Sequence, residues 1–291
     1  MRITTFLLLL SALVGCTRTQ VHERTEEQVV KMPPASIRVE LTSGSVSLTV
    51  TRALDATVRA IWSTSDGDRT AAEVRLMQCD LGIDTDSGTF EINPKMPENV
   101  SVSLVITLPD TQGVIINTGN GSIDVNGASG SAMLTSGNGA IRCVDQDGTV
   151  SARTDNGAIQ VVNATDAVEV ISRNGAIEIL EAMAYVRAKT NSGRIVLTTQ
   201  DDSSPPIFAQ SDNGSVDVTV GPAFVGEIAM KAVNGTSTVE DPGQRLRVNA
   251  VDGDVRHLVL GDSEQRTSIS TRNGSVRLTI GTGPPPGDPA G

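Results

Sequence analysis

The feature that most constrains this fold is a turn signal that recurs at a nearly fixed interval. The tetrapeptide Asn-Gly-Ala-Ile stands at 156–159 and again at 174–177. From Gly121 onward the turn glycine returns at intervals of 18, 18, 18, 18, 21, 21, 18 and 21 residues. Asn and Gly accept positive φ most easily, so each pair predicts a sharp corner. The corner residues that we single out are Asn120, Gly121, Asn138, Gly139, Asn156, Gly157, Asn174, Gly175, Gly193, Asn213, Gly214, Asn273 and Gly274.

Apolar residues alternate with polar ones on both sides of each corner. Two and four residues after the glycine come pairs such as Ile159 and Val161, or Ile177 and Ile179. Before the corner the same alternation appears, and the position three before the glycine is nearly always small. A period of two predicts strands with one buried face.

Two architectures fit this local pattern. Asn-Gly between alternating strands is also the strongest short signal for a β-hairpin, so a chain of hairpins would place the same residues on one face. A solenoid, in contrast, requires a nearly constant period, because each coil sits on the last. The repeated spacing of 18, lengthened only by three, favours an all-β fold: a single-chain parallel β-solenoid of about ten coils of 18–21 residues. Ile159 should then lie directly over Ile177.

The two ends of the repeat region differ from its middle. We expect regular coils over 111–281, and over 36–110, which contains the single Trp, irregular coils that double as an N-terminal cap. The tail 282–291 is rich in Pro and Gly and is expected to be disordered. Prolines 284–286 follow the last strand and cannot extend a ladder, which favours a monomer.

The N-terminus reads as a lipoprotein signal. Arg2 precedes an apolar run from Phe6 to Val14 that is too short to span a bilayer. The following Leu-Val-Gly-Cys resembles a bacterial lipobox, which implies removal of 1–15 and lipidation of Cys16; an ordinary secretory signal with a chance cysteine is the alternative. Residues 16–35 are polar and are expected to be a tether. Because Thr17, not Asp, follows the cysteine, the resemblance implies sorting to an outer membrane.

Charge and cysteine content restrict the partners. Without Arg2, 22 basic and 34 acidic side chains leave a net charge of 22 − 34 = −12. No cluster of cations is visible, which argues against nucleic acid and anionic lipid surfaces as partners. Cys79 and Cys143 could form a disulfide, but Cys143 occupies an apolar column and is better explained as a small buried hydrophobe.

The run Leu108–Val125 carries a family resemblance. A Leu-Pro turn, a strand, a corner and then Ile-x-Val, repeated along the chain, resemble bacterial envelope proteins with β-strand-repeat or "putative adhesin" domains of unknown function. The resemblance covers about 36–281. It implies a β-solenoid outside the cytoplasm and supplies no catalytic residues.

No constellation of residues predicts catalysis. The two histidines are His22, in the expected tether, and His257, a strand residue beside which Leu258 and Leu260 should take the inward positions. With so few histidines, neither a Ser-His-Asp triad nor a His-based zinc site is expected, and we expect no metal or cofactor.

Carboxylates and aromatic residues give no clear site either. Asp124 and Glu178, on the outward face, should lie about 14 Å apart, too far for the paired acids of glycoside hydrolysis. Exposed aromatics, which often bind sugars, are scattered along the sequence: Trp62, Tyr185 and Phe208.

The sequence therefore predicts a non-enzymatic, lipid-anchored cell-envelope β-solenoid that acts as a structural or adhesin-like binding surface. Its partners would be the membrane, through Cys16, and an envelope protein or glycan. A carbohydrate-active β-helix enzyme and a self-assembling envelope scaffold remain alternatives.

Overall fold

The computed structural model describes residues 4–7, 21–31, 33–51 and 55–282. The chain divides into two compact units, residues 1–139 and 140–291. Both are built mainly from β-strands, and parallel coils form most of unit 2 and part of unit 1, which confirms the predicted β-solenoid. The predicted signal sequence lies mostly outside the described residues, as do Cys16 and 283–291 of the predicted tail. Within that signal, Thr4–Leu7 form strand β1, which pairs antiparallel with β2.

The coils of unit 1 stack on one long strand, β3 (Ser36–Val50), which contains a corner at Gly44. Its first half pairs in parallel with β8 (Gly113–Asn120), and its second half with β9 (Ile123–Asn126). The next layer, β10 (Ser131–Asn138), pairs with β8 in register, so that Leu134 lies against Ile116 and Ala132 against Val114. All four side chains are at most 1% exposed and form a continuous apolar column.

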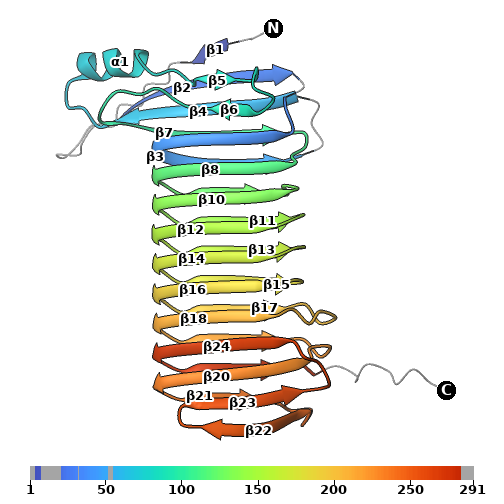
Figure 1. Ribbon diagram of the computed structural model, residues 1–291. Coiled ribbons are helices and arrows are strands. Elements are labelled where there is room, and N and C mark those ends of the chain that lie inside the picture. The colour runs from blue at the N-terminus through green and yellow to red at the C-terminus, as the bar shows by residue number, and fades with distance from the viewer. Residues whose placement is uncertain (1–3, 8–20, 32, 52–54, 283–291) are drawn as a thin grey trace. The chain divides into compact units, whose positions relative to one another are not determined.

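An antiparallel sheet and a helix complete unit 1 on the other side of β3 (Figure 1). The sheet consists of β2 (His22–Lys31), β4 (Asp55–Thr64) and β7 (Val100–Leu108), and β7 pairs in parallel with the second half of β3. A short hairpin, β5 (Ile83–Asp84) and β6 (Phe90–Ile92), pairs with the first half of β3. The fully buried Trp62 lies on β4.

The helix α1 (Arg69–Met77) was not predicted. Asp68 caps it by accepting a hydrogen bond from the Thr70 amide at 2.8 Å, and Arg69 pairs with Glu73 one turn later at 2.9 Å. Ala72 and Leu76 face the interior. These signals are short, and they lie in a region for which the sequence predicts only irregular coils.

The expected tether is too long. His22–Lys31 form β2, and Arg24 on β2 donates hydrogen bonds to the carbonyls of Leu76 and Cys79 at the end of α1, at 2.6 and 3.0 Å. Arg24 also pairs with Glu26, which is only 5% exposed. Polar composition suggested a solvated linker, but these polar groups have partners inside unit 1.

In unit 2, two strands per coil build two stacked sheets. Sheet A consists of β11 (Ile141–Gln146), β13 (Ile159–Ala164), β15 (Ile177–Ala182), β17 (Ile195–Thr199), β19 (Val216–Val220), β25 (Val276–Ile280) and β21 (Ser237–Glu240). Sheet B consists of β12 (Val150–Asn156), β14 (Val168–Asn174), β16 (Val186–Ser192), β18 (Ile207–Asn213), β24 (Arg266–Asn273), β20 (Gly226–Asn234), β23 (Val255–Leu260) and β22 (Leu246–Asp252). As predicted, Ile159 lies opposite Ile177 in the register, and both are 1% exposed.

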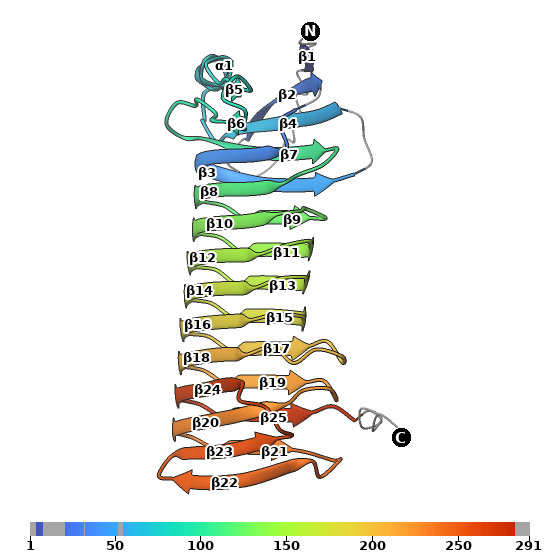
Figure 2. The same ribbon diagram turned by 45° about the vertical axis from the view of Figure 1, so that its right-hand side comes forward.

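The coils of unit 2 do not stack in chain order. After β18 and β19 the chain passes over one layer to form β20 and β21, turns through β22 and β23, and returns to insert β24 and β25 into the layer left open (Figure 2). Asn273 therefore lies between Asn213 and Asn234. The last strand of the chain, β25, is therefore an interior layer between β19 and β21 and does not end the stack.

Two further glycines with turn signals, Gly253 and Gly88, lie in hairpin turns and not in solenoid corners. Gly253 joins the antiparallel strands β22 and β23, with φ of +56° and open space around it. Gly88, with φ of +78°, lies in the connection between β5 and β6. Asn-Gly-like turns serve both architectures, and only the neighbouring strands decide which one forms.

The cysteines behave as buried thiols. Cys143 is fully buried and its sulfur lies 3.8 Å from Gln146 Oε1. The Cys79 thiol donates to the Arg75 carbonyl at 3.5 Å, and burial raises its pKa, although Arg24 opposes this shift. No disulfide joins Cys79 to another described residue.

Candidate functional site

The residues that the sequence singled out lie at the corners of the coils, where hydrogen bonds join neighbouring coils. Within each unit, the buried hydroxyl three residues before a corner glycine donates to the carbonyl of the corner glycine in the neighbouring coil. The pairs are Thr118 to Gly44, Ser136 to Gly121, Ser172 to Gly157, Thr190 to Gly175, Ser211 to Gly193 and Thr271 to Gly214, at 2.8–3.1 Å. The sequence shows only that these residues are small, and the hydrogen bond becomes evident only in the structure.

The residues before the glycines form ladders of side-chain amides. Asn138 donates to Asn120, Asn174 to Asn156, Asn273 to Asn213 and Asn234 to Asn273, at 2.8–2.9 Å. The corner glycines of neighbouring coils also lie in close contact. A Cβ added to any of six of them would collide with the carbonyl oxygen of the glycine in the neighbouring coil: Gly121, Gly139, Gly175, Gly193, Gly214 and Gly274. Hydrogen bonding and close approach account for the corner residues without a ligand.

The outer face of sheet A is polar and largely satisfied within the chain. Arg142 donates to Gln160 at 3.2 Å, and Gln160 donates to Glu178 at 2.6 Å, each from one coil to the next. Farther along, Arg194 pairs with Asp217 at 2.7 Å. Because these groups already bind one another, this face suits solvation better than recognition.

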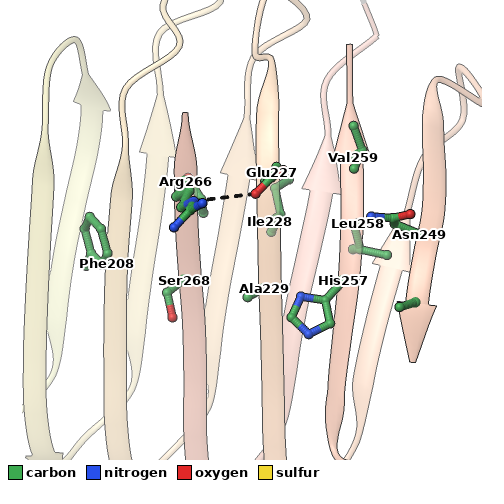
Figure 3. Close-up of a pocket in the computed structure, with 12 residues that line it drawn as sticks. Phe208, Glu227, Ile228, Ala229, Asn249, His257, Leu258, Val259, Arg266 and Ser268 are labelled. Atoms are coloured by element: carbon green, nitrogen blue, oxygen red, sulfur yellow. Dashed lines mark ion pairs between the residues drawn. The ribbon is translucent and has the colours of Figure 1, made fainter. Parts of the chain in front are cut away.

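The outer face of sheet B contains a trough of about 390 Å³ in unit 2. One row of directly opposed residues crosses it in the order Phe208, Ser268, Ala229, His257 and Ala250. The small side chains of Ser268 and Ala229 form its floor, and the rings of Phe208 and His257 stand on either side (Figure 3). The inserted layer β24 supplies Ser268 and lies between β18 and β20, so the trough depends on the changed order of the coils.

The wall at Phe208 is an aromatic pair. Tyr185, which directly precedes β16, lies with its ring centroid 5.8 Å from that of Phe208, and the planes are tilted by 44°. The two residues are 37% and 40% exposed. The sequence separates them by 23 residues, so they looked scattered, but the register of β16 and β18 brings them together.

Charged groups surround the trough unevenly. Glu227 at one end pairs with Arg266 at 3.6 Å (Figure 3), and Glu169 pairs with Arg187 beside Phe208 at 3.5 Å. A parallel row of opposed residues runs next to the first, in the order Lys189, Gln210, Ser270 and Lys231. This row contains two amines and no carboxylate, which is notable in a chain with a formal net charge of −11.

His257 stands on the outside of the sheet, while Leu258 and Leu260 are 2% and 1% exposed, as predicted. Glu227 is the one carboxylate among the residues that line the trough. Across the described ranges, no group of three or more His, Cys, Asp or Glu side chains could hold a metal ion. No helix in those ranges is long and apolar enough to cross a membrane.

Comparison with known proteins gives one family. A family model described as Toastrack DUF4097 matches residues 11–257. None of the curated proteins matches the chain.

Several solved structures are similar to it at low sequence identity. One is a "putative cell adhesion protein" from Clostridium sporogenes, 9% identical, with 88% of this chain and 99% of that chain covered and a TM-score of 0.29. A "putative adhesin" from Bacteroides fragilis is 11% identical over 90% and 98% of the two chains, with a TM-score of 0.26. Another from Parabacteroides merdae is 8% identical over 87% and 95%, also with a TM-score of 0.26.

Proposed function

The chain belongs to the Toastrack DUF4097 family, and we propose that it is a lipid-anchored protein of the cell envelope that binds a polysaccharide without cleaving it. The family match confirms the resemblance noted in the sequence. The trough on sheet B is the observation that carries the proposal.

The side chains of the trough suit an extended sugar polymer. Sugars are recognised by aromatic rings that stack on their apolar faces and by polar groups that bind their hydroxyls. The Tyr185–Phe208 pair supplies exposed rings, and Gln210, Ser268 and Ser270 supply hydrogen-bonding groups within the same surface. The floor of the trough is the outer face of a sheet, along which an extended polymer can lie.

The same residues argue against cleavage. Glycoside hydrolysis usually needs two carboxyl groups on either side of the scissile bond. The trough has one, Glu227, and its charge is already paired with Arg266. Binding without hydrolysis is the function that this surface supports best.

Lipid anchoring at Cys16 and placement in the outer membrane remain part of the proposal. Cys16 ends an apolar segment in a lipobox-like sequence, and acyl chains gain about 0.8 kcal/mol for each buried methylene. Anchoring would keep the binding surface in the envelope, where polysaccharides are abundant.

A binding assay with purified envelope and extracellular polysaccharides tests the proposal. We expect at least one to bind, and Phe208→Ala to raise the dissociation constant about tenfold, which corresponds to about 1.4 kcal/mol. The matched control is Met133→Ala, since Met133 is 52% exposed on unit 1 and far from the trough in sequence, and this variant should bind normally. Equal binding by Phe208→Ala, or no binding to any polysaccharide, would overturn the proposal. Release of shortened sugars would refute its non-catalytic part.

A further inference from the structure

The strand β22 ends sheet B of unit 2 with a free edge (Figure 2). It pairs with β23 on one side, and no described strand pairs with it on the other. Every residue from Arg247 to Asp252 is exposed, and Val248 and Val251 are 64% and 65% exposed. An edge strand with unpaired backbone groups and exposed valine side chains can pair with a further strand.

The register of β22 shows which face each of its residues occupies. Val248 lies opposite the buried Leu258, so it points to the core side, and Arg247 points to the outer side. Asn249 is a bulged residue, because Val248 and Ala250 lie opposite consecutive residues of β23. The bulge resets the alternation: Val251 returns to the core side, opposite Arg256, and Asp252 to the outer side.

As a result, the two halves of β22 mirror each other. Going outward from its centre, each half has a valine on the core side and then a charged residue on the outer side, Arg247 in one half and Asp252 in the other. No described carboxylate lies within ion-pair distance of Arg247, and no described cation lies within that distance of Asp252.

We propose that β22 pairs antiparallel with β22 of a second copy of this chain. Placing Arg247 opposite Asp252 of the second copy brings Val248 opposite Val251 of that copy, and two-fold symmetry repeats both pairs. Each dimer then gains two ion pairs on the outer face and two valine pairs on the core face, together with backbone hydrogen bonds along the edge. The contact is isologous, so it closes at two copies.

This inference replaces the expectation of a monomer. That expectation rested on the prolines after the last strand, which were thought to terminate the stack. In the structure β25, which leads to those prolines, is an interior layer, and the strand that ends sheet B is β22. Charges and bulges often protect sheet edges from pairing. Here both features are placed symmetrically about the centre of the strand and make its two halves complementary.

Charge exchange at positions 247 and 252 tests the proposal. The protein is the mature chain from residue 16 with Cys16→Ser, studied by sedimentation velocity over a range of concentrations. We expect a monomer–dimer equilibrium for this protein. Arg247→Asp alone and Asp252→Arg alone each oppose like charges at both ends, and each should weaken the dimer at least about tenfold.

Mixing the two single variants should restore the dimer, because each copy then offers charges opposite to those of the other. This mixture also shows that both variants are folded. A wild-type protein that stays monomeric, a dimer that Arg247→Asp leaves unchanged, mixed variants that stay apart, or assembly beyond two copies would overturn the proposal. Neither position lines the trough, so failure here leaves polysaccharide binding intact, and failure of sugar binding leaves the dimer.

Discussion

At the scale of single residues, each corner combines three tasks. The glycine allows two backbones to approach closely, the asparagine before it extends an amide ladder, and the serine or threonine three before it binds a carbonyl of the neighbouring coil. Thr190 is fully buried and Ser172 is 1% exposed, so their hydroxyls would be costly to bury without these bonds. Repetition of one local solution explains why the sequence repeats so closely.

The glycine requirement gives a direct prediction. In Gly175→Ala, the new methyl group would meet the carbonyl of Gly157, and backbone cannot move away as a flexible side chain can. We expect the free energy of unfolding to fall by about 1–3 kcal/mol, measured by chemical denaturation of the whole chain. Gly67→Ala is the matched control: no atom lies within 4 Å of its added Cβ, so its stability should stay within about 0.5 kcal/mol of the wild type. Equal losses in both variants would contradict this account of the corners.

At the scale of strands, the inserted layer is the main departure from the repeat. The strand β24 pairs in parallel with both β18 and β20, and this places Ser270 between Gln210 and Lys231. Intervals of 18 and 21 residues continue through this region, so spacing alone suggests an uninterrupted stack. Local patterns specify that a segment forms a coil, but equivalent coils can exchange places without changing any local pattern.

A pair of engineered cysteines distinguishes the observed order of the coils, with β24 inserted, from stacking in chain order. Gln210→Cys with Ser270→Cys places two thiols opposite each other on adjacent strands, within the separation that a disulfide requires. We expect this pair to oxidise readily, as judged by gel mobility with and without reductant. Gln210→Cys with Lys231→Cys has a strand between its two positions and should remain reduced. The reverse result would indicate that the coils stack in chain order, and Ser268 would then not lie between Phe208 and Ala229.

At the scale of the whole molecule, the proposed anchor and the binding surface belong to different units. The tether is shorter than its composition suggests, because the ordered strand β2 begins at His22. The six residues 16–21 that precede His22 can span at most about 20 Å. If Cys16 is lipidated, unit 1 is therefore held close to the membrane surface.

The anchor can be tested by cell fractionation. Cys16→Ser removes the acylated sulfur, so we expect the protein to move from the membrane to the soluble fraction. Thr17→Asp keeps the lipid, and by the resemblance to lipoprotein sorting it should remain in membranes but shift from the outer to the inner one. Continued membrane association of Cys16→Ser would show that another part of the chain binds the membrane, and the lipoprotein interpretation would then fail.

The sequence by itself determined the class of fold, the positions of most corners and the inward-facing residues. Those properties follow from turn chemistry and from a period of two, which act over a few residues. Tertiary structure alone decided which coil lies on which. By the repeat spacing, Gly274 could stack on Gly253, the preceding turn glycine, but in the structure it stacks on Gly214. The same choice brought Phe208 beside Ser268 and left β22 at the edge, since contacts between distant segments depend on the order of the layers.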